Sequence, residues 1–299
     1  MLWQPRWWPS HAVVALLWLI HFLPLGAQAR LGRGLGTAMR RLGTRRRHIV
    51  ATNLRLCFPE LDEAAREALA REHFAVLGRS FIERGLVWWA SPERLRRLVR
   101  VEGLERLRAL HAAEERIILL APHFVGLDIG GTRMCLEFDG AALYSPQKDK
   151  VVDRWLRHGR QRFRQQEMLT RSDNVRPLVR AVRAGAMLYY LPDMDLGRKD
   201  AIFVPFFGVP AATITALPRL ARLTGARVVP CVVRMQPGGE GYVVELAEPW
   251  ADYPSGDVVA DTRRMNAWLE GVVRTMPAQY YWVHRRFKTR PDGEPPLYG

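Results

Sequence analysis

The sequence predicts an α/β protein whose larger part is one domain, and three observations support this. Short apolar runs of strand length alternate with helical patterns from about residue 116 onward. The 299 residues are 48% hydrophobic, which is enough for a large core. After residue 60, no internal repeat, low-complexity tract or linker divides the chain.

The alternation can be followed element by element. A helical pattern begins at Asp62, which is suited to cap it, and continues to about Trp88, and two shorter helical stretches follow Pro92. Strands are expected over residues 116–121, 140–145, 186–192, 201–208, 226–235 and 241–247, with a further aromatic strand just before residue 284. Helices are expected over residues 151–166, 175–184, 212–224 and 258–276.

The N-terminal end combines an apolar segment with a basic one. Residues 12–29 are apolar apart from His21 and Gln28, and residues 30–55 are rich in arginine, with no acidic residue before Glu60. We expect an uncleaved membrane-anchoring helix, because arginine-rich flanks stay on the cytoplasmic side. A stretch of 18 residues is borderline for a spanning helix. The alternatives are a cleaved secretory signal, since residues 27–29 imitate a cleavage site, and a buried core helix.

The basic segment favours a membrane surface as partner. Such clusters attract anionic head groups by roughly 1 kcal/mol per charge. Nucleic acid is not expected, because no RNP, zinc-finger or helix-turn-helix sequence follows. The chain is thus divided into residues 1–59, an anchor with a basic juxtamembrane segment, and residues 60–299, a catalytic domain.

The charged and sulfur-containing residues narrow the chemistry. The net charge is +15, and only four lysines accompany the arginines. Codon usage is one explanation, and repeated phosphate or carboxylate contacts are the other. Three widely separated cysteines without any CxxC suggest neither a disulfide framework nor a zinc site, so no metal or cofactor is expected.

The stretch APHFVGLDIGG (residues 121–131) places Asp128 five positions after His123. With eight histidines and 30 acidic residues, one such spacing is expected by chance. A regular helix separates the two side chains by about 140°, and a strand puts them on opposite faces. Pro122 and Gly126 supply the break that contact requires, with Asp128 in the first turn of a new helix.

A carboxylate at a helix N-terminus stays ionised and accepts a hydrogen bond from imidazole, which leaves the other ring nitrogen as a base. His123 and Asp128 are therefore a candidate catalytic pair, and an ordinary histidine in a turn is the alternative. The chain has no G-x-S-x-G or Walker A sequence. A pair without its own nucleophile implies that the substrate brings the hydroxyl.

From about residue 40 onward the chain resembles the late acyltransferases of lipid A biosynthesis, the lauroyl and myristoyl transferase family with its H-x4-D/E motif. The resemblance is carried by the stretch around His123 and by four further blocks, residues 45–61, 192–213, 220–234 and 277–293. It implies a glycerolipid-acyltransferase-like mixed sheet flanked by helices, behind an N-terminal membrane-anchoring helix.

The resemblance also implies a function. An enzyme on the cytoplasmic face of a Gram-negative inner membrane would move a fatty acyl group from acyl carrier protein to a hydroxyl of a lipid A precursor. His123 would take the proton from that hydroxyl, with Asp128 orienting the imidazole. A glycerophospholipid or another glycolipid is the alternative acceptor, and a noncatalytic basic membrane-binding module is the alternative class.

Substrate-binding candidates form three groups. Arg160, Arg162 and Arg171 are expected to hold acceptor phosphates, or to line a solvated helix face. Asp193 and Asp195 follow a strand and are expected to order the site or to bind a polar substrate group.

The third group is His284, Arg285 and Arg286, in a basic block that the resemblance marks as phosphate- or sugar-binding. An ordinary surface tail is the other reading of that block. The sequence leaves acyl length, the acylated position and oligomeric state open.

Overall fold

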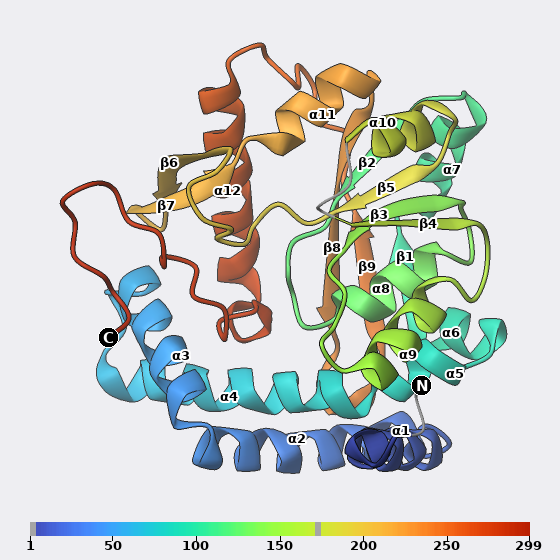
Figure 1. Cartoon of the computed structure of the whole chain (residues 1–299), viewed down its shortest axis with the longest axis vertical. Coiled ribbons are helices and arrows are strands. Elements are labelled where there is room, and N and C mark those ends of the chain that lie inside the picture. The colour runs from blue at the N-terminus through green and yellow to red at the C-terminus, as the bar shows by residue number, and fades with distance from the viewer. Residues whose placement is uncertain (1–3, 171–174) are drawn as a thin grey trace.

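The core of the protein is a mixed seven-stranded sheet with helices on both faces (Figure 1). The structure, a computed structural model, describes residues 4–170 and 175–299. The strand order is β1-β9-β8-β2-β5-β3-β4; β8 and β9 pair antiparallel, and the other pairs are parallel. The strands are β1 (Val99–Glu102), β2 (Ile117–Leu120), β3 (Gly140–Tyr144), β4 (Gln166–Thr170), β5 (Met187–Tyr190), β8 (Arg227–Met235) and β9 (Tyr242–Leu246).

The helices before β2 are α1 (Trp8–Ile20), α2 (Leu25–Leu42), α3 (Thr44–Cys57), α4 (Glu63–Ile82), α5 (Arg84–Trp89), α6 (Pro92–Leu98) and α7 (Leu104–Ala112). Those after it are α8 (Leu127–Met134), α9 (Lys150–Arg160), α10 (Val175–Arg183), α11 (Ala216–Thr224) and α12 (Val258–Thr275). A separate hairpin is formed by β6 (Ala201–Phe206) and β7 (Val209–Ile214). The predicted α/β architecture is confirmed, and Asp62 caps α4 by accepting from the Ala65 amide.

Three strands were missed by the sequence patterns, for physical reasons. β1 and β4 are the two edges of the sheet, where half-exposed strands carry no continuous apolar run. The helix expected over 151–166 is too long, because α9 ends at Arg160 and residue 166 is the first residue of β4. β7 follows β6 after a two-residue turn in which Phe207 and Gly208 both have positive φ. The aromatic strand expected before residue 284 is absent; within it, Tyr280 makes only a single bridge to Phe124.

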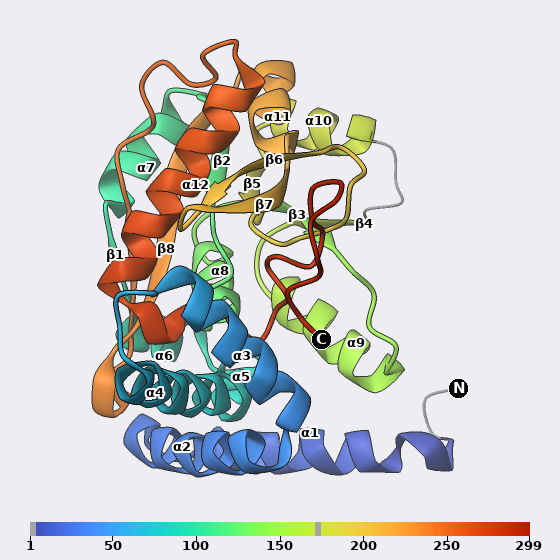
Figure 2. The same cartoon turned by 90° about the vertical axis from the view of Figure 1, so that its left-hand side faces the viewer.

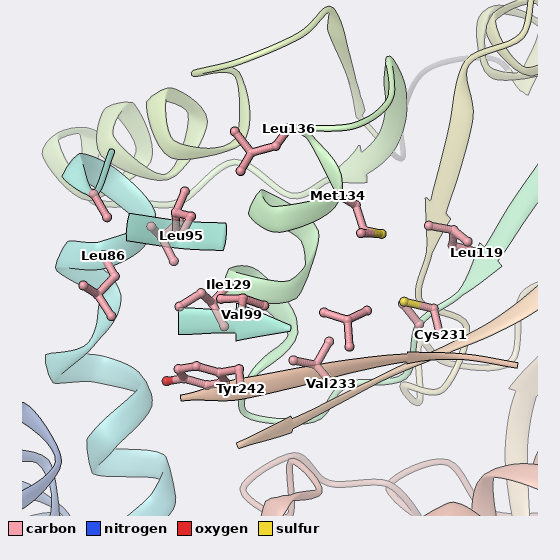
Figure 3. Close-up of a cluster of buried hydrophobic side chains, with 14 of the residues drawn as sticks. Leu86, Leu95, Val99, Leu119, Ile129, Met134, Leu136, Cys231, Val233 and Tyr242 are labelled. Atoms are coloured by element: carbon pink, nitrogen blue, oxygen red, sulfur yellow. The ribbon is translucent and has the colours of Figure 1, made fainter. Parts of the chain in front are cut away.

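Alternate residues of the central strands pack into different cores. Ile117 and Leu119 of β2 face the helices α5 to α8, whereas Ile118 and Leu120 face α10 and α11. Figure 3 shows part of the first cluster, to which α8 contributes Ile129 and Met134 and β8 contributes Val233. A third cluster joins α3, α4, α12, the β6–β7 hairpin and the C-terminal segment.

Helix α2 lies against α4 at the base of the molecule, at very short range (Figures 1 and 2). Gly32 and Gly36 of α2 face Gly78 of α4, and a Cβ on Gly36 would overlap the carbonyl oxygen of Phe74. A Cβ on Gly78 would overlap the backbone of both α2 glycines. The absence of these side chains lets the two backbones touch, so α2 is a fixed part of the fold.

The apolar segment expected as one anchor over residues 12–29 is interrupted. α1 ends at Ile20, Pro24 follows, and α2 begins at Leu25. None of the helices in the described residues has the length and hydropathy needed to span a bilayer. The anchoring helix is thus unconfirmed, and the division at residues 59 and 60 stays a prediction.

Replacing Gly36 by alanine should lower the free energy of unfolding by roughly 1–3 kcal/mol, because the added methyl group has no space against α4. Gly34 lies on the same helix and has nothing within 4 Å of a built Cβ. Gly34→Ala is the matched control, and it should raise stability by up to about 1 kcal/mol through helix propensity. Chemical denaturation of both variants measures the difference, and equal effects would contradict the close helix crossing.

Candidate active site

The site lies where two neighbouring parallel strands end. In the register of β2 with β5, Leu120 pairs with Tyr190, so partners lie seventy positions apart. Both strands continue through one residue and a proline to a polar residue, and these polar residues are His123 and Asp193. They too are seventy positions apart, so the strand register brings them together at the carboxyl edge of the sheet, where ligands bind in α/β folds.

Asp193 forms two hydrogen bonds with His123. The ring nitrogen Nδ1 of His123 lies 2.7 Å from Asp193 Oδ1, and the backbone N–H of His123 donates to Asp193 Oδ2 at 3.0 Å. The Tyr280 hydroxyl donates to the same Oδ2 at 3.1 Å. Burial by itself would raise the pKa of Asp193, but the charge and hydrogen bonds of His123 outweigh it and hold that pKa below its ordinary value.

The ionised state of Asp193 decides the tautomer of His123. A carboxylate only accepts hydrogen bonds, so Nδ1 must carry the proton. In the neutral ring Nε2 is then the unprotonated nitrogen, and no described residue hydrogen-bonds to it. The side chain of His123 is 19% exposed while that of Asp193 is 2% exposed. The arrangement thus leaves one basic nitrogen, on a partly exposed ring, without a hydrogen bond to a described residue.

Asp128 is engaged by two arginines. It lies in the first turn of α8, as predicted, where Arg160 donates to Oδ1 at 2.9 Å and Arg84 lies 3.1 Å from Oδ2. Burial would raise the pKa of Asp128, but the two guanidinium groups outweigh it and lower that pKa to about 2. The expected contact between Asp128 and His123 is not made, because Asp193 takes Nδ1. A catalytic role for Asp128 stays a prediction.

Of the three arginines expected near the acceptor, the two that the structure describes have different environments. Arg160 bonds to Asp128 and keeps 30% of its side chain exposed. Arg162 donates to the carbonyl oxygens of Val87 and Ala90 at 2.7 and 2.6 Å, where it satisfies the C-terminal end of α5. Arg171 lies outside the described residues. Only Arg160 of the described pair is joined to Asp128, and substrate binding by all three stays a prediction.

Asp195 and His284 join the site to the C-terminal segment. The backbone N–H of Asp195 donates to His284 Nε2 at 3.0 Å, and the Asp195 carboxylate accepts from the Thr289 amide and hydroxyl at 2.6 and 2.8 Å. Burial is the main reason that the pKa of His284 falls to about 4. A neutral His284 that accepts a backbone hydrogen bond fixes the loop after β5, which also carries Asp193.

Arg286 is almost completely buried. It donates to the carbonyl oxygen of Ala212 at 2.9 Å and to the Thr213 hydroxyl at 2.8 Å. Arg285 is partly exposed and lies over the Tyr298 ring. In this structure His284 and Arg286 of the basic block fix the C-terminal segment to the loop after β5 and to β7. The expected binding of phosphate or sugar by the block stays a prediction.

The sequence patterns did not single out Arg84 or Tyr280, although both contact a carboxylate of the site. Beside Arg84 and Asp128 lies a small cavity of about 10 Å³, bounded also by Glu83 and Tyr242, whose side chains hydrogen-bond to each other. Within residues 4–170 and 175–299, no cluster of three or more His, Cys, Asp or Glu side chains has an arrangement suited to a metal ion.

Comparison with known proteins identifies the family. The family model described as bacterial lipid A biosynthesis acyltransferase matches residues 2–289. The chain belongs to this family. It is similar to the lipid A biosynthesis lauroyltransferase of Escherichia coli (strain K12), with 36% identity over 99% of this chain and 96% of the relative.

Two further relatives from the same organism carry different acyl names. The palmitoleoyltransferase is 33% identical over 99% of this chain and 96% of its own length. The myristoyltransferase is 34% identical over 97% of this chain and 90% of its own length. The resemblance found in the sequence blocks is thereby confirmed for nearly the whole chain, while the relatives differ in the acyl group that they are named for.

Stability should depend on pH through His284. Its folded pKa of about 4 lies below the ordinary value of 6.5, so the unfolded chain binds the proton more readily between these values. The contribution is fully present above about pH 6.5 and is lost as the pH falls toward 4. Urea unfolding at several pH values measures this loss, which amounts to as much as roughly 3 kcal/mol.

His284→Gln is the matched variant, because its side-chain oxygen keeps an acceptor for the Asp195 amide but does not titrate. It should reduce the slope of stability against pH, leaving the part due to buried His73, whose pKa burial lowers to about 4 as well. An unchanged slope in the variant would contradict this assignment.

Proposed function

We propose that the chain is a membrane-bound O-acyltransferase of lipid A biosynthesis, which transfers a fatty acyl group from an acyl carrier protein thioester to a hydroxyl of a hydroxyacyl chain on a lipid A precursor. The observation that carries the proposal is the partly exposed imidazole of His123, whose Nδ1 is held by Asp193 and whose Nε2 has no enzyme nucleophile within hydrogen-bonding distance among the described residues. Membership of the family supports the reaction class.

The reaction follows from that geometry. The acceptor hydroxyl attacks the thioester carbonyl while His123 Nε2 takes its proton. A C–O bond forms and the carbonyl electrons move onto oxygen, giving a tetrahedral intermediate. On collapse the C–S bond breaks, and the imidazolium returns the proton to the departing thiolate. Nδ1 keeps its proton throughout and donates it in a hydrogen bond to a carboxylate. Nε2 can therefore accept the proton in the first step and return it in the second.

The developing oxyanion needs positive charge or donors nearby. We assign this role to the pair of Arg84 and Arg160, with the N-terminal end of α8 at Gly126 as the other source. The two guanidinium groups carry one positive charge more than Asp128 neutralises. Arg160 is partly exposed, and the same charge suits an acceptor phosphate.

The acyl length and the acylated position are not part of the proposal. The relatives are named for lauroyl, palmitoleoyl and myristoyl groups, so family membership does not choose among them. A ladder of acyl donors assayed with one acceptor determines the length.

For the location we propose the cytoplasmic face of a bacterial inner membrane, reached through an N-terminal apolar surface. This surface consists of exposed side chains of α1, α2 and the loop between them, namely Trp8, Val13, Leu16, Trp18, Leu19, Phe22, Leu31 and Leu35. Exposed arginines at positions 30, 33 and 41 lie on the same helices. An apolar face with a basic border suits anionic lipid head groups and the acyl chains beneath them.

His123→Ala should reduce the transfer rate by roughly 10²- to 10⁴-fold, the usual contribution of a positioned general base. The assay uses purified enzyme, acyl carrier protein thioester and a lipid A precursor, with product identified by mass spectrometry. Asp128→Ala should also be strongly impaired. His48→Ala, at an exposed position on α3, is the control and should keep wild-type activity.

Near wild-type transfer by the His123 variant would refute the proposed mechanism. Wild-type activity toward a glycerophospholipid but not toward the lipid A precursor would reassign the acceptor. Vesicle binding without any turnover would support the noncatalytic alternative.

Changing both Leu16 and Leu19 to glutamate should weaken vesicle binding at least tenfold, because burial of each leucine is worth roughly 1.5–3 kcal/mol. Flotation with vesicles of phosphatidylethanolamine and phosphatidylglycerol measures the bound fraction. Leu223→Glu is the control, since Leu223 is similarly exposed but lies on α11, at the opposite end of the molecule (Figure 1). Equal loss in both variants would refute the assigned surface.

A further inference from the structure

Two carboxylates lie near His123, and the structure uses them differently. Asp193 contacts the ring and the backbone of His123, while Asp128 contacts Arg84 and Arg160. The H-x4-D spacing suggests the opposite, with Asp128 on the imidazole. The contacts therefore separate the role of orienting the base from the role of holding positive charge.

We propose that Asp193 is the positioning residue that holds His123 in its reactive tautomer, and that Asp128 acts through Arg84 and Arg160. This inference rests on the proposed function, because it assigns the second carboxylate of the same site. It concerns the roles of the two carboxylates, and it leaves donor and acceptor as proposed above.

The contacts of Asp193 suit an orienting role. One oxygen holds the ring and the other holds the His123 amide, so the carboxylate fixes the imidazole relative to its own backbone. The Tyr280 hydroxyl fixes the carboxylate in turn. The carbonyl oxygen of His123 accepts from the Tyr281 amide at 3.0 Å, which ties the loop to the same C-terminal segment. Burial of Asp193 keeps water from competing for these bonds.

The contacts of Asp128 do not suit an orienting role. Each of its oxygens already faces one guanidinium group, at 2.9 and 3.1 Å. Turning the carboxylate toward the imidazole would break at least one charge-assisted hydrogen bond and leave a half-buried arginine unpaired, which is costly. The side chains of Arg84 and Arg160 are 23% and 30% exposed, so part of each guanidinium-bearing side chain stays open to a substrate while both hold Asp128.

The test compares Asp193→Asn with Asp128→Asn in full-length, detergent-purified protein labelled with ¹⁵N-histidine. His123→Gln assigns the signal, because the chain has eight histidines. Ring ¹⁵N shifts and their couplings report the tautomer of neutral His123 without any substrate. Asp195→Asn is the matched control, a buried carboxylate two positions away that contacts Thr289 instead of the base.

We expect the Nδ1–H tautomer in wild type, in Asp128→Asn and in Asp195→Asn. Asp193→Asn should lose it, because an amide can turn its NH₂ group toward Nδ1. Its kcat should fall by up to roughly 10⁴-fold, as when the orienting carboxylate of a Ser-His-Asp triad becomes an amide, with a smaller change in KM. Asp193→Glu, which restores a carboxylate, should recover part of kcat.

The inference is overturned if wild-type His123 carries its proton on Nε2, an outcome read from the wild-type protein once His123→Gln has assigned the signal. It is also overturned if Asp128→Asn removes the Nδ1–H tautomer, or if Asp193→Asn keeps both that tautomer and kcat. Failure of the proposed function looks different: the His123→Ala enzyme stays active, or wild type does not transfer acyl groups, whatever the tautomer.

Discussion

The pair of hydrogen bonds between Asp193 and His123 is the interaction on which the rest of the site depends. It exists because β2 and β5 are adjacent and parallel, and because both chains leave the sheet in the same way. A shift of either strand by one residue would move a polar side chain to the other face. The buried cores on both faces of the sheet fix that register, so packing far from the site determines how His123 and Asp193 meet.

The C-terminal segment holds the two loops that carry His123 and Asp193. Its residues bond to the loops after β2 and β5 through Tyr280, Tyr281, His284 and Thr289. Asn53 of α3 donates to the carbonyl oxygens of Trp282 and His284 at 2.7 and 2.8 Å, which ties the segment to the N-terminal helices. Residues close to both ends of the chain thus hold the centre of the site.

Sequence patterns predicted the central strands, since strands buried on both faces leave continuous apolar runs, but missed the edge strands β1 and β4. The sequence predicts His123 as the base and Asp128, five residues later, as its partner, whereas the structure places Asp193 on the imidazole. The better signal was the repeated order of strand, proline and polar residue at 117–123 and 187–193, which places His123 and Asp193 at equivalent positions. Reading it requires knowing that β2 and β5 are neighbours, which spacing alone does not give.

Some of the arginines have a structural role that neither codon usage nor anion binding explains. Arg162 and Arg286 donate to backbone carbonyls in the interior, and Arg46 donates to the carbonyl of Val283 at 2.8 Å. A planar group with five donors satisfies several carbonyls at once, which lysine does not. Arginine in a basic block is thus a weak guide to substrate contact: Arg160 bonds to the Asp128 carboxylate, whereas Arg162, two residues later, bonds to backbone carbonyls.

A structure with a hydroxyacyl glycolipid bound tests the central claim most directly. The account predicts the acceptor hydroxyl within hydrogen-bonding distance of His123 Nε2, with Nδ1 still on Asp193 and Asp128 still between its two arginines. An imidazole turned so that Asp128 holds one of its nitrogens, with Asp193 released, would contradict it.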